Sequence, residues 1–177
     1  MTSEGAIFVN ATEIVVADAG PLIHLDELQC INLLADFSEV LVPDAVWAEV
    51  MHHRPQALLC TDIRWVQCCS KTSEKVTALA KLYTLHSGER EALDVCMEFP
   101  GSLLLTDDTA ARLAAKTLDI RAHGSLGLLI RAIRRHQLSK RKVVTLLQQI
   151  PSRSSLHIRP GLLADIIRQV NESPDVQ

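Results

Sequence analysis

The segment at residues 14–21 constrains the fold of this chain more than any other stretch. Three β-favouring aliphatic residues at 14–16 lead into Asp18, and Gly20-Pro21 then changes the chain direction. The pattern predicts a short strand that ends in a carboxylate, followed by a helix that begins at Pro21. In an open parallel sheet, ligands bind beyond the carboxyl ends of the strands, so Asp18 stands where a site would form.

The same pattern recurs at residues 102–109. A short aliphatic run ends in Thr106-Asp107-Asp108, and an alanine-rich helix is predicted over 109–117. Apolar spacing predicts the remaining elements: strands at 40–42, 63–68 and 120–123, and helices at 31–37, 44–53, 73–83, 87–99, 126–136, 143–150 and 162–170. Strands that alternate with helices favour an α/β fold with a mainly parallel sheet.

Length and composition predict one domain. The 177 residues are 47% hydrophobic and only 3% aromatic, so aliphatic side chains must fill a single core. We expect that domain over residues 12–170, with an extension at 1–11 and a flexible tail at 171–177. Residues 1–12 lack the pattern of a secretory signal and no segment is apolar enough to span a bilayer, so the cytoplasm is the expected compartment.

The five cysteines are odd in number and scattered through apolar surroundings. They contain no Cys-x-x-Cys and no Cys/His grouping with zinc-ligand spacing. We therefore expect reduced, buried thiols and no structural zinc site.

Five acids gather at one edge of the expected sheet. Right-handed crossovers bring the strand ends that carry Asp18, Asp107 and Asp108 to the same edge, and helices carry Glu49 and Glu89 toward it. Taken singly, each has an ordinary explanation as a helix cap, a first-turn acid or a surface residue. Together they would repel one another unless protonated or neutralised by cations, and Mg²⁺ or Mn²⁺ binds carboxylate oxygens well.

Four segments in this order resemble the PIN-domain nucleases, especially the short VapC-type toxins. They are Val-Val-Ala-Asp18-Ala-Gly-Pro-Leu-Ile, Val-Pro-Asp-Ala-Val-Trp-Ala-Glu49-Val, Gly-Glu89-Arg-Glu-Ala-Leu and Leu-Leu-Thr-Asp107-Asp108. The resemblance covers about residues 14–136. It implies a three-layer α/β/α fold with a central, mainly parallel sheet of four to five strands.

The resemblance also implies an activity and a set of ligands. Asp18, Glu49, Glu89 and Asp108 match the acidic quartet that binds Mg²⁺ or Mn²⁺ to hydrolyse RNA, with Asp107 as the reserve for the fourth place. It further implies a homodimer and a small antitoxin that blocks the acidic groove. Two positions depart from the typical toxins: Gly20 replaces a small hydroxyl or amide residue, and Glu89 replaces an Asp.

Positive charge is concentrated late in the chain. Between Asp119 and Asp165 there is no acid, yet this stretch holds nine of the 18 cations, and the rest of the chain carries 21 acids against nine bases. This asymmetry fits a polyanionic partner or a solvated helical face. The residues that could steer RNA are Arg131, Arg134, Arg135, Lys140, Arg141 and Lys142. The segment Gly124-Ser125-Leu126-Gly127 resembles a family segment that could hold a substrate phosphate, but a lone glycine motif is a weak signal and a helix cap is the favoured interpretation.

Three functions compete on these residues. The first is a metal-dependent endoribonuclease, as in the toxin of a toxin–antitoxin pair, and the second is a non-catalytic PIN-like module that binds RNA or protein. A phosphatase or response-regulator domain is a third, but Gly20 stands where a phosphatase needs its second Asp, and Asp107-Asp108 comes too late for a receiver. No phosphate-binding lysine loop or Gly-x-Gly-x-x-Gly is present.

Overall fold

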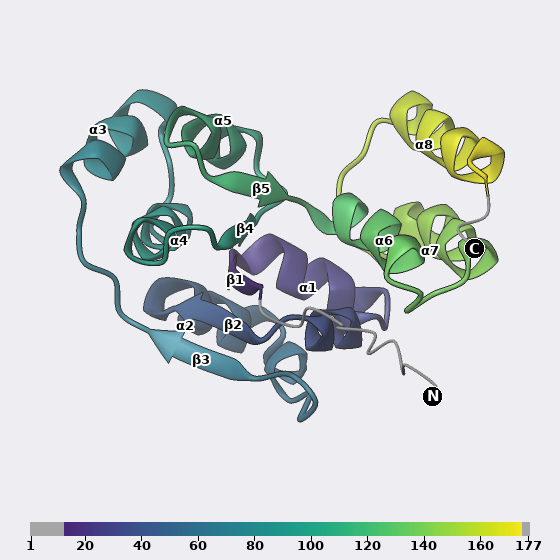
Figure 1. The fold of residues 1–177 in the computed structure, drawn as a ribbon, viewed down its shortest axis with the longest axis horizontal. Helices are drawn as coiled ribbons and strands as arrows, with labels where there is room; N and C mark the ends of the chain where they lie inside the picture. Colours follow the sequence, from purple (N-terminus) through teal and green to yellow (C-terminus); the bar gives the residue numbers. More distant parts are fainter. Residues whose placement is uncertain (1–12, 175–177) are drawn as a thin grey trace, which may run out of the picture.

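A five-stranded, all-parallel sheet forms the centre of the computed structural model, which describes residues 13–174. The strands are β1 (Ile14–Ala17), β2 (Glu39–Pro43), β3 (Trp65–Cys68), β4 (Leu103–Leu105) and β5 (Arg121–His123). Their order across the sheet is β3-β2-β1-β4-β5 (Figure 1). The predicted α/β class with a parallel sheet is confirmed.

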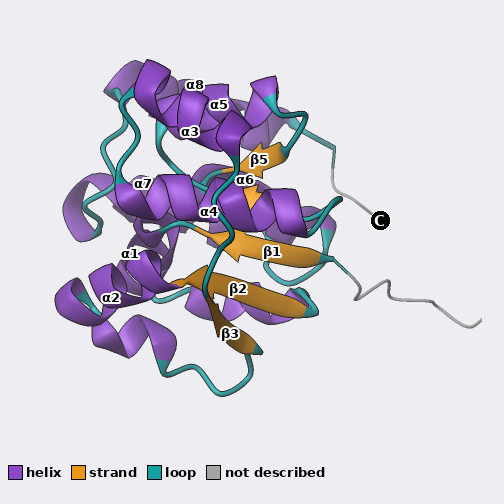
Figure 2. Cartoon of the chain, turned by 90° about the vertical axis from the view of Figure 1, so that its left-hand side faces the viewer, coloured by secondary structure: helices purple, strands orange, loops and turns teal. Residues whose placement is uncertain are grey.

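Helices connect the strands and cover both faces of the sheet (Figure 2). In chain order they are α1 (Ala19–Glu27), the 3₁₀ helix η1 (Ile31–Asp36), α2 (Asp44–His53), the 3₁₀ helix η2 (Pro55–Leu58), α3 (Glu74–Tyr83), α4 (Ser87–Glu98), α5 (Thr109–Thr117), α6 (Ser125–Arg134), α7 (Lys140–Arg153) and α8 (Pro160–Glu172). None of the helices described in the chain is long and apolar enough to cross a membrane.

The core lies on the two faces of the sheet. Successive strand residues point to opposite faces, so Val15 packs with α1, α2, α6 and α7, whereas Val16 packs with α3, α4 and α5. Both side chains are fully buried. Burial on both faces explains why the strands read as continuous aliphatic runs rather than as alternating ones.

The chain reverses its direction of winding at β1. From there β2 and β3 extend the sheet on one side, and β4 and β5 extend it on the other. Ala17 of β1 lies opposite Leu105 of β4, and the amide of Asp18 donates to the carbonyl of Leu105 at 2.8 Å. The residues that follow β1 and β4 therefore meet at a topological switch point, where open α/β sheets form their crevice.

Several predicted boundaries differ from the structure by a few residues, and three of the differences are informative. Helix α1 begins at Ala19 rather than Pro21, because Asp18 caps it. Pro151 lies inside the last turn of α7, where a turn was expected, because the buried residues Leu147 and Ile150 hold the helix against the core through the proline. Helix α8 continues to Glu172, two residues into the expected tail. The expected extension at 1–11 and residues 175–177 lie outside the described residues.

All five cysteines are free thiols. Cys30 and Cys96 are buried, and burial raises the pKa of each thiol to about 12, as expected for inert core residues. The expectation of burial is wrong for the other three: Cys60 and Cys68 are only partly buried, and Cys69, which follows the end of β3, is exposed.

Candidate active site at the switch point

Asp18 lies at the switch point with only 8% of its surface exposed. Its Oδ1 accepts a hydrogen bond from the Ala19 amide at 2.8 Å, and its Oδ2 accepts one from the Thr106 hydroxyl at 2.8 Å. The pKa of Asp18 is raised to about 6. Burial is the main cause and the nearby Glu89 and Glu49 contribute, while the two hydrogen bonds oppose the rise. This carboxyl group is therefore costly to ionise unless a cation approaches it.

Glu49 and Asp18 approach each other across Gly88. A Cβ atom placed on Gly88 would lie 3.7 Å from Glu49 Oε2 and 3.8 Å from Asp18 Oδ1. The approach follows from the packing of α2 on α4, which the Ala45 amide strengthens by donating to Glu91 at 2.9 Å. Gly88 thus brings two carboxylates together by leaving the space between them open.

Glu89 lies in the first turn of α4, beside the same space. Its Oε2 accepts a hydrogen bond from the His86 amide at 2.8 Å, and its side chain is 13% exposed. The bond closes the amino-terminal end of α4 and holds the carboxylate near the helix start, where the helix dipole favours negative charge.

Asp108 is the cap of α5. Its Oδ1 accepts from the Ala111 amide at 2.7 Å, and its own amide donates to the Thr106 hydroxyl oxygen at 3.2 Å. Thr106 is fully buried and links Asp108 to Asp18. One threonine hydroxyl therefore sets the positions of acids that follow two different strands.

Asp107 is engaged differently from its neighbour. Its Oδ2 accepts from His24 Nδ1 at 2.7 Å and from the Ser125 hydroxyl at 2.6 Å, and its Oδ1 accepts from the Ser125 amide at 2.7 Å. Burial alone would raise the pKa of Asp107, but these bonds from His24 and Ser125 lower it overall. Arg112 Nη2 stands 3.9 Å from Oδ1. Both carboxylate oxygens are thus used within the protein.

The five acids line one cavity of about 570 Å³, here called the acidic cavity. They are Asp18, Glu49, Glu89, Asp107 and Asp108. Carboxylate oxygens are the ligands that Mg²⁺ and Mn²⁺ prefer. Within residues 13–174, however, no three or more His, Cys, Asp or Glu side chains are grouped closely enough to hold a metal ion as they stand.

The six cations of the predicted RNA-steering set lie away from the acidic cavity. Arg131 and Arg135 form ion pairs with Asp36, and the Arg131 guanidinium lies 4.4 Å from the centre of the Phe37 ring. Arg131 also pairs with Glu13, which precedes β1, so this end of α6 lies at the amino edge of the sheet. Two of the six cations therefore fasten α6 to η1.

The start of α6 does not have the role that the glycine motif suggested. The amide and hydroxyl of Ser125 bind the carboxylate of Asp107, so a side chain of the protein occupies the position proposed for a phosphate. Gly124 is required there, because a Cβ atom would lie 2.0 Å from Arg112 Nη2 and 2.5 Å from Asp107 Oδ1. The helix-cap interpretation of this segment is the correct one.

Four residues at the site carried little or no signal in the sequence. They are His24, Thr106, Arg112 and His86. His24 is four residues after Gly20 on the first helix, so helical spacing places it near the strand end, and Thr106 directly precedes the two acids. Arg112 is isolated from the basic stretch, but it follows Asp107 by five residues, in the first turn of α5, and its side chain reaches back to that carboxylate.

A family model for the PIN domain matches residues 14–172. Curated proteins give no match to this sequence. Among solved structures, a PilT N-terminus domain protein from the hyperthermophilic archaeon Sulfolobus solfataricus P2 matches with a TM-score of 0.49 and 16% identity, over 68% of this chain and 93% of that one.

Proposed function

We propose that this protein, which belongs to the PIN-domain family, is a metal-dependent endoribonuclease. One observation supports the proposal above the others: the Asp18 and Glu49 carboxylates approach the same point across Gly88, inside a cavity that three further acids line. Such a concentration of like charge in a partly buried cavity is costly without a cation. A divalent metal is the partner that this chemistry calls for.

The side chains that would hold the metal are Asp18, Glu49, Glu89 and Asp108. Their oxygens suit Mg²⁺ or Mn²⁺, and Glu49 and Glu89 project from helices on flexible arms that can adjust to an ion. When bound, the metal would activate a water and stabilise the negative charge that develops during phosphodiester hydrolysis. Asp107 belongs to the hydrogen-bonded framework, and we assign the fourth place to Asp108.

The remaining residues of the site orient these acids. Thr106 donates to Asp18 Oδ2 and keeps that carboxylate turned toward Glu49. His24 and Ser125 hold Asp107, which keeps the end of β4 in place between α1 and α6. These hydrogen bonds keep the framework of the site in place, and the Glu49 and Glu89 side chains adjust when a metal binds.

A cleavage assay tests the proposal. We expect the wild type to cut single-stranded RNA in Mn²⁺, and Asp18→Asn and Glu49→Gln to be inactive while remaining folded. Asp165→Asn, on the exposed face of α8, is the matched control and should cut normally. Failure to cut RNA with either metal, together with no thermal shift on adding Mn²⁺, would contradict the proposal.

A non-catalytic binding module is the second candidate, favoured by the absence of a preassembled metal group in residues 13–174. RNA binding that needs no metal and survives Glu49→Gln and Glu89→Gln would support it. If binding requires those acids and Mn²⁺, the module hypothesis fails.

The biological setting rests on the sequence resemblance alone. We propose a cytoplasmic homodimer that acts as the toxin of a pair, with a small antitoxin that covers the acidic cavity. Light scattering on the purified protein tests the dimer, and a neighbouring antitoxin reading frame would support the pair.

A further inference from the structure

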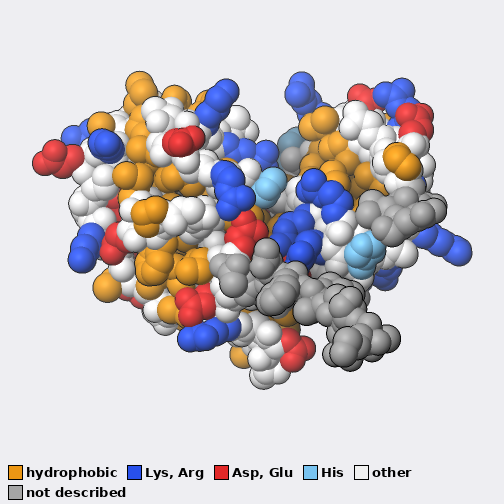
Figure 3. All heavy atoms as spheres, in the orientation of Figure 1, with side chains coloured by type: hydrophobic (Ala, Val, Ile, Leu, Met, Phe, Trp, Pro, Cys, Tyr) orange, Lys and Arg blue, Asp and Glu red, His pale blue; other side chains and the backbone are white. Residues whose placement is uncertain are grey.

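A groove lies along β5, the edge strand of the sheet. Its volume is about 300 Å³, and α5 and β5 form its walls. Three cations line it, Arg112 and Lys116 from α5 and Arg121 from β5, against one acid, Asp119. We call these three cations the α5–β5 strip. Figure 3 shows Lys and Arg side chains gathered over this part of the molecule and, separately, over α6.

Arg112 connects the strip to the acidic cavity. Its Nε donates to the carbonyl of Thr106 at 3.2 Å, and its Nη2 lies 3.9 Å from Asp107 Oδ1. The absent side chain of Gly124 provides the space for this guanidinium. Because 46% of the Arg112 side chain remains exposed and Asp107 already accepts three other hydrogen bonds, the guanidinium keeps donors for a further anion.

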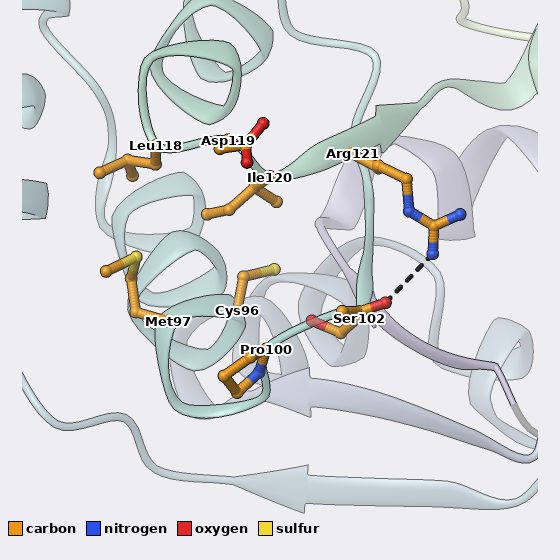
Figure 4. Close-up of a pocket in the computed structure, with 9 residues that line it drawn as sticks. Cys96, Met97, Pro100, Ser102, Leu118, Asp119, Ile120 and Arg121 are labelled. Atoms are coloured by element: carbon orange, nitrogen blue, oxygen red, sulfur yellow. Dashed lines mark hydrogen bonds between the residues drawn. The ribbon is translucent and has the colours of Figure 1, made fainter.

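Lys116 and Arg121 continue the strip away from the cavity. Lys116 is exposed one helical turn beyond Arg112, so about 6 Å of helix axis separates the two. Arg121 begins β5 and donates to Glu13 at 2.7 Å and to the carbonyl of Gly101 at 3.1 Å. Figure 4 shows its side chain directed away from Asp119, and the dashed line marks its hydrogen bond to the carbonyl of Gly101. Glu13 therefore compensates Arg121, Asp107 compensates Arg112 only in part at 3.9 Å, and Lys116 forms no ion pair among the described residues.

We propose that the α5–β5 strip, rather than the cations of α6 and α7, carries the phosphate backbone of single-stranded RNA to the acidic cavity. This inference rests on the proposed function, because it takes RNA as the substrate. Arg112 binds the phosphate nearest the acids, and Lys116 binds the next one along the groove. No aromatic side chain lines the strip among the described residues, so the contacts are with phosphates and carry little base specificity.

The experiment measures binding without cleavage. Fluorescence anisotropy with a labelled single-stranded RNA of mixed sequence is recorded in Ca²⁺, over a range of salt concentrations. We compare Arg112→Gln/Lys116→Gln with Arg141→Gln/Lys142→Gln from α7 and with the matched control Arg153→Gln/Arg159→Gln, each of which removes two charges. Arg112→Lys is added because it keeps the charge if the glutamine variant at this position folds poorly.

We expect Arg112→Gln/Lys116→Gln to weaken binding about tenfold and to reduce the salt dependence, the slope of log K against log [salt], by about 1.4. Arg112→Lys should keep most of the affinity, and the other two double variants should bind like the wild type. Wild-type affinity in Arg112→Gln/Lys116→Gln, a larger loss in Arg141→Gln/Lys142→Gln, or no RNA binding at all would overturn the inference. If RNA binding depends on the α5–β5 strip but the protein cuts no RNA in Mn²⁺, the strip is an RNA-binding surface and the proposed hydrolysis is refuted.

Discussion

Thr106 and Asp18 are joined by a 2.8 Å hydrogen bond between the threonine hydroxyl and Asp18 Oδ2, although 88 residues separate them in the sequence. The bond connects the carboxyl ends of β4 and β1, and both side chains are buried. The same hydroxyl oxygen accepts from the Asp108 amide. The position of two proposed metal ligands therefore depends on one threonine.

Thr106→Val should destabilise the protein and impair the site. Valine keeps the shape of the side chain but leaves Asp18 Oδ2 and the Asp108 amide without this partner, which costs about 1–3 kcal/mol of unfolding free energy. The lost hydrogen bond should also raise the pKa of Asp18 further, so activity should begin at a higher pH. Urea unfolding and a pH profile of RNA cleavage measure the two effects.

Thr117→Val is the control for that substitution. Its hydroxyl donates to the carbonyl of Leu113 at an exposed position on α5, so its loss should change stability by less than about 0.5 kcal/mol. Equal effects of the two substitutions would show that the buried hydrogen bond has no special role.

Asp18→Asn should stabilise the metal-free protein at high pH. The pKa of Asp18 rises from its ordinary value of 3.8 to about 6 in the folded protein. Stability contributed by the protonated carboxyl group is therefore present below about pH 4 and lost as the pH rises through about 6. The difference in unfolding free energy between the variant and the wild type should therefore shift in favour of the variant by about 3 kcal/mol between pH 4 and pH 8.

Denaturant unfolding of both proteins in EDTA, from pH 4 to pH 8, measures this difference. Adding Mn²⁺ at pH 8 should then stabilise the wild type alone, because the ion binds the ionised carboxylate. A stability difference that stays constant with pH would mean that the pKa of Asp18 is not raised.

Gly88→Ala should reduce cleavage, whereas Gly20→Ala should increase stability. A methyl group on Gly88 would lie 3.2 Å from Val46 Cγ2 and between the carboxylates of Asp18 and Glu49. Cleavage should fall by about tenfold or more, since small displacements of reacting groups are costly. A methyl group on Gly20 meets nothing closer than His24 Cε1 at 3.5 Å and should add about 0.5–1 kcal/mol of stability to α1.

Thermal unfolding and initial cleavage rates distinguish these two glycines. If Gly20→Ala inactivates the protein without unfolding it, the space beside His24 is needed for substrate binding, and the prediction that Gly20 accepts a methyl group is wrong.

Asp107→Asn and Asp108→Asn should separate the two adjacent acids. Asparagine at 107 weakens the bonds from His24 and Ser125, so we expect a loss of about 1–3 kcal/mol of stability. Asparagine at 108 still caps α5, so that variant should fold normally but lose Mn²⁺-dependent cleavage. Urea midpoints and Mn²⁺ titrations of activity test the assignment, which fails if Asp107→Asn alone abolishes the response to Mn²⁺.

Most elements of the fold were predictable because their signals are local. Strands buried on both faces appear as aliphatic runs, and Asp44 to His53 forms a helix with the predicted bounds because its apolar residues repeat at helical spacing. The position of Asp18 at the sheet edge was also predictable, since parallel strands connected by right-handed crossovers place their carboxyl ends together. The effect of Pro151 was less predictable, because the tertiary packing of α7 outweighs a local breaker.

The sequence by itself determined the α/β class, the strand-end acids and the candidate metal chemistry, because these depend on apolar periodicity and on residue type. The tertiary structure decided which hydrogen-bond partners each acid has. Asp107 and Asp108 are identical side chains at adjacent positions, yet one binds His24 and Ser125 and the other caps α5. The tertiary structure also committed Arg131 to Asp36, 95 positions earlier in the chain, because the partners of a side chain depend on contacts between segments far apart in the sequence.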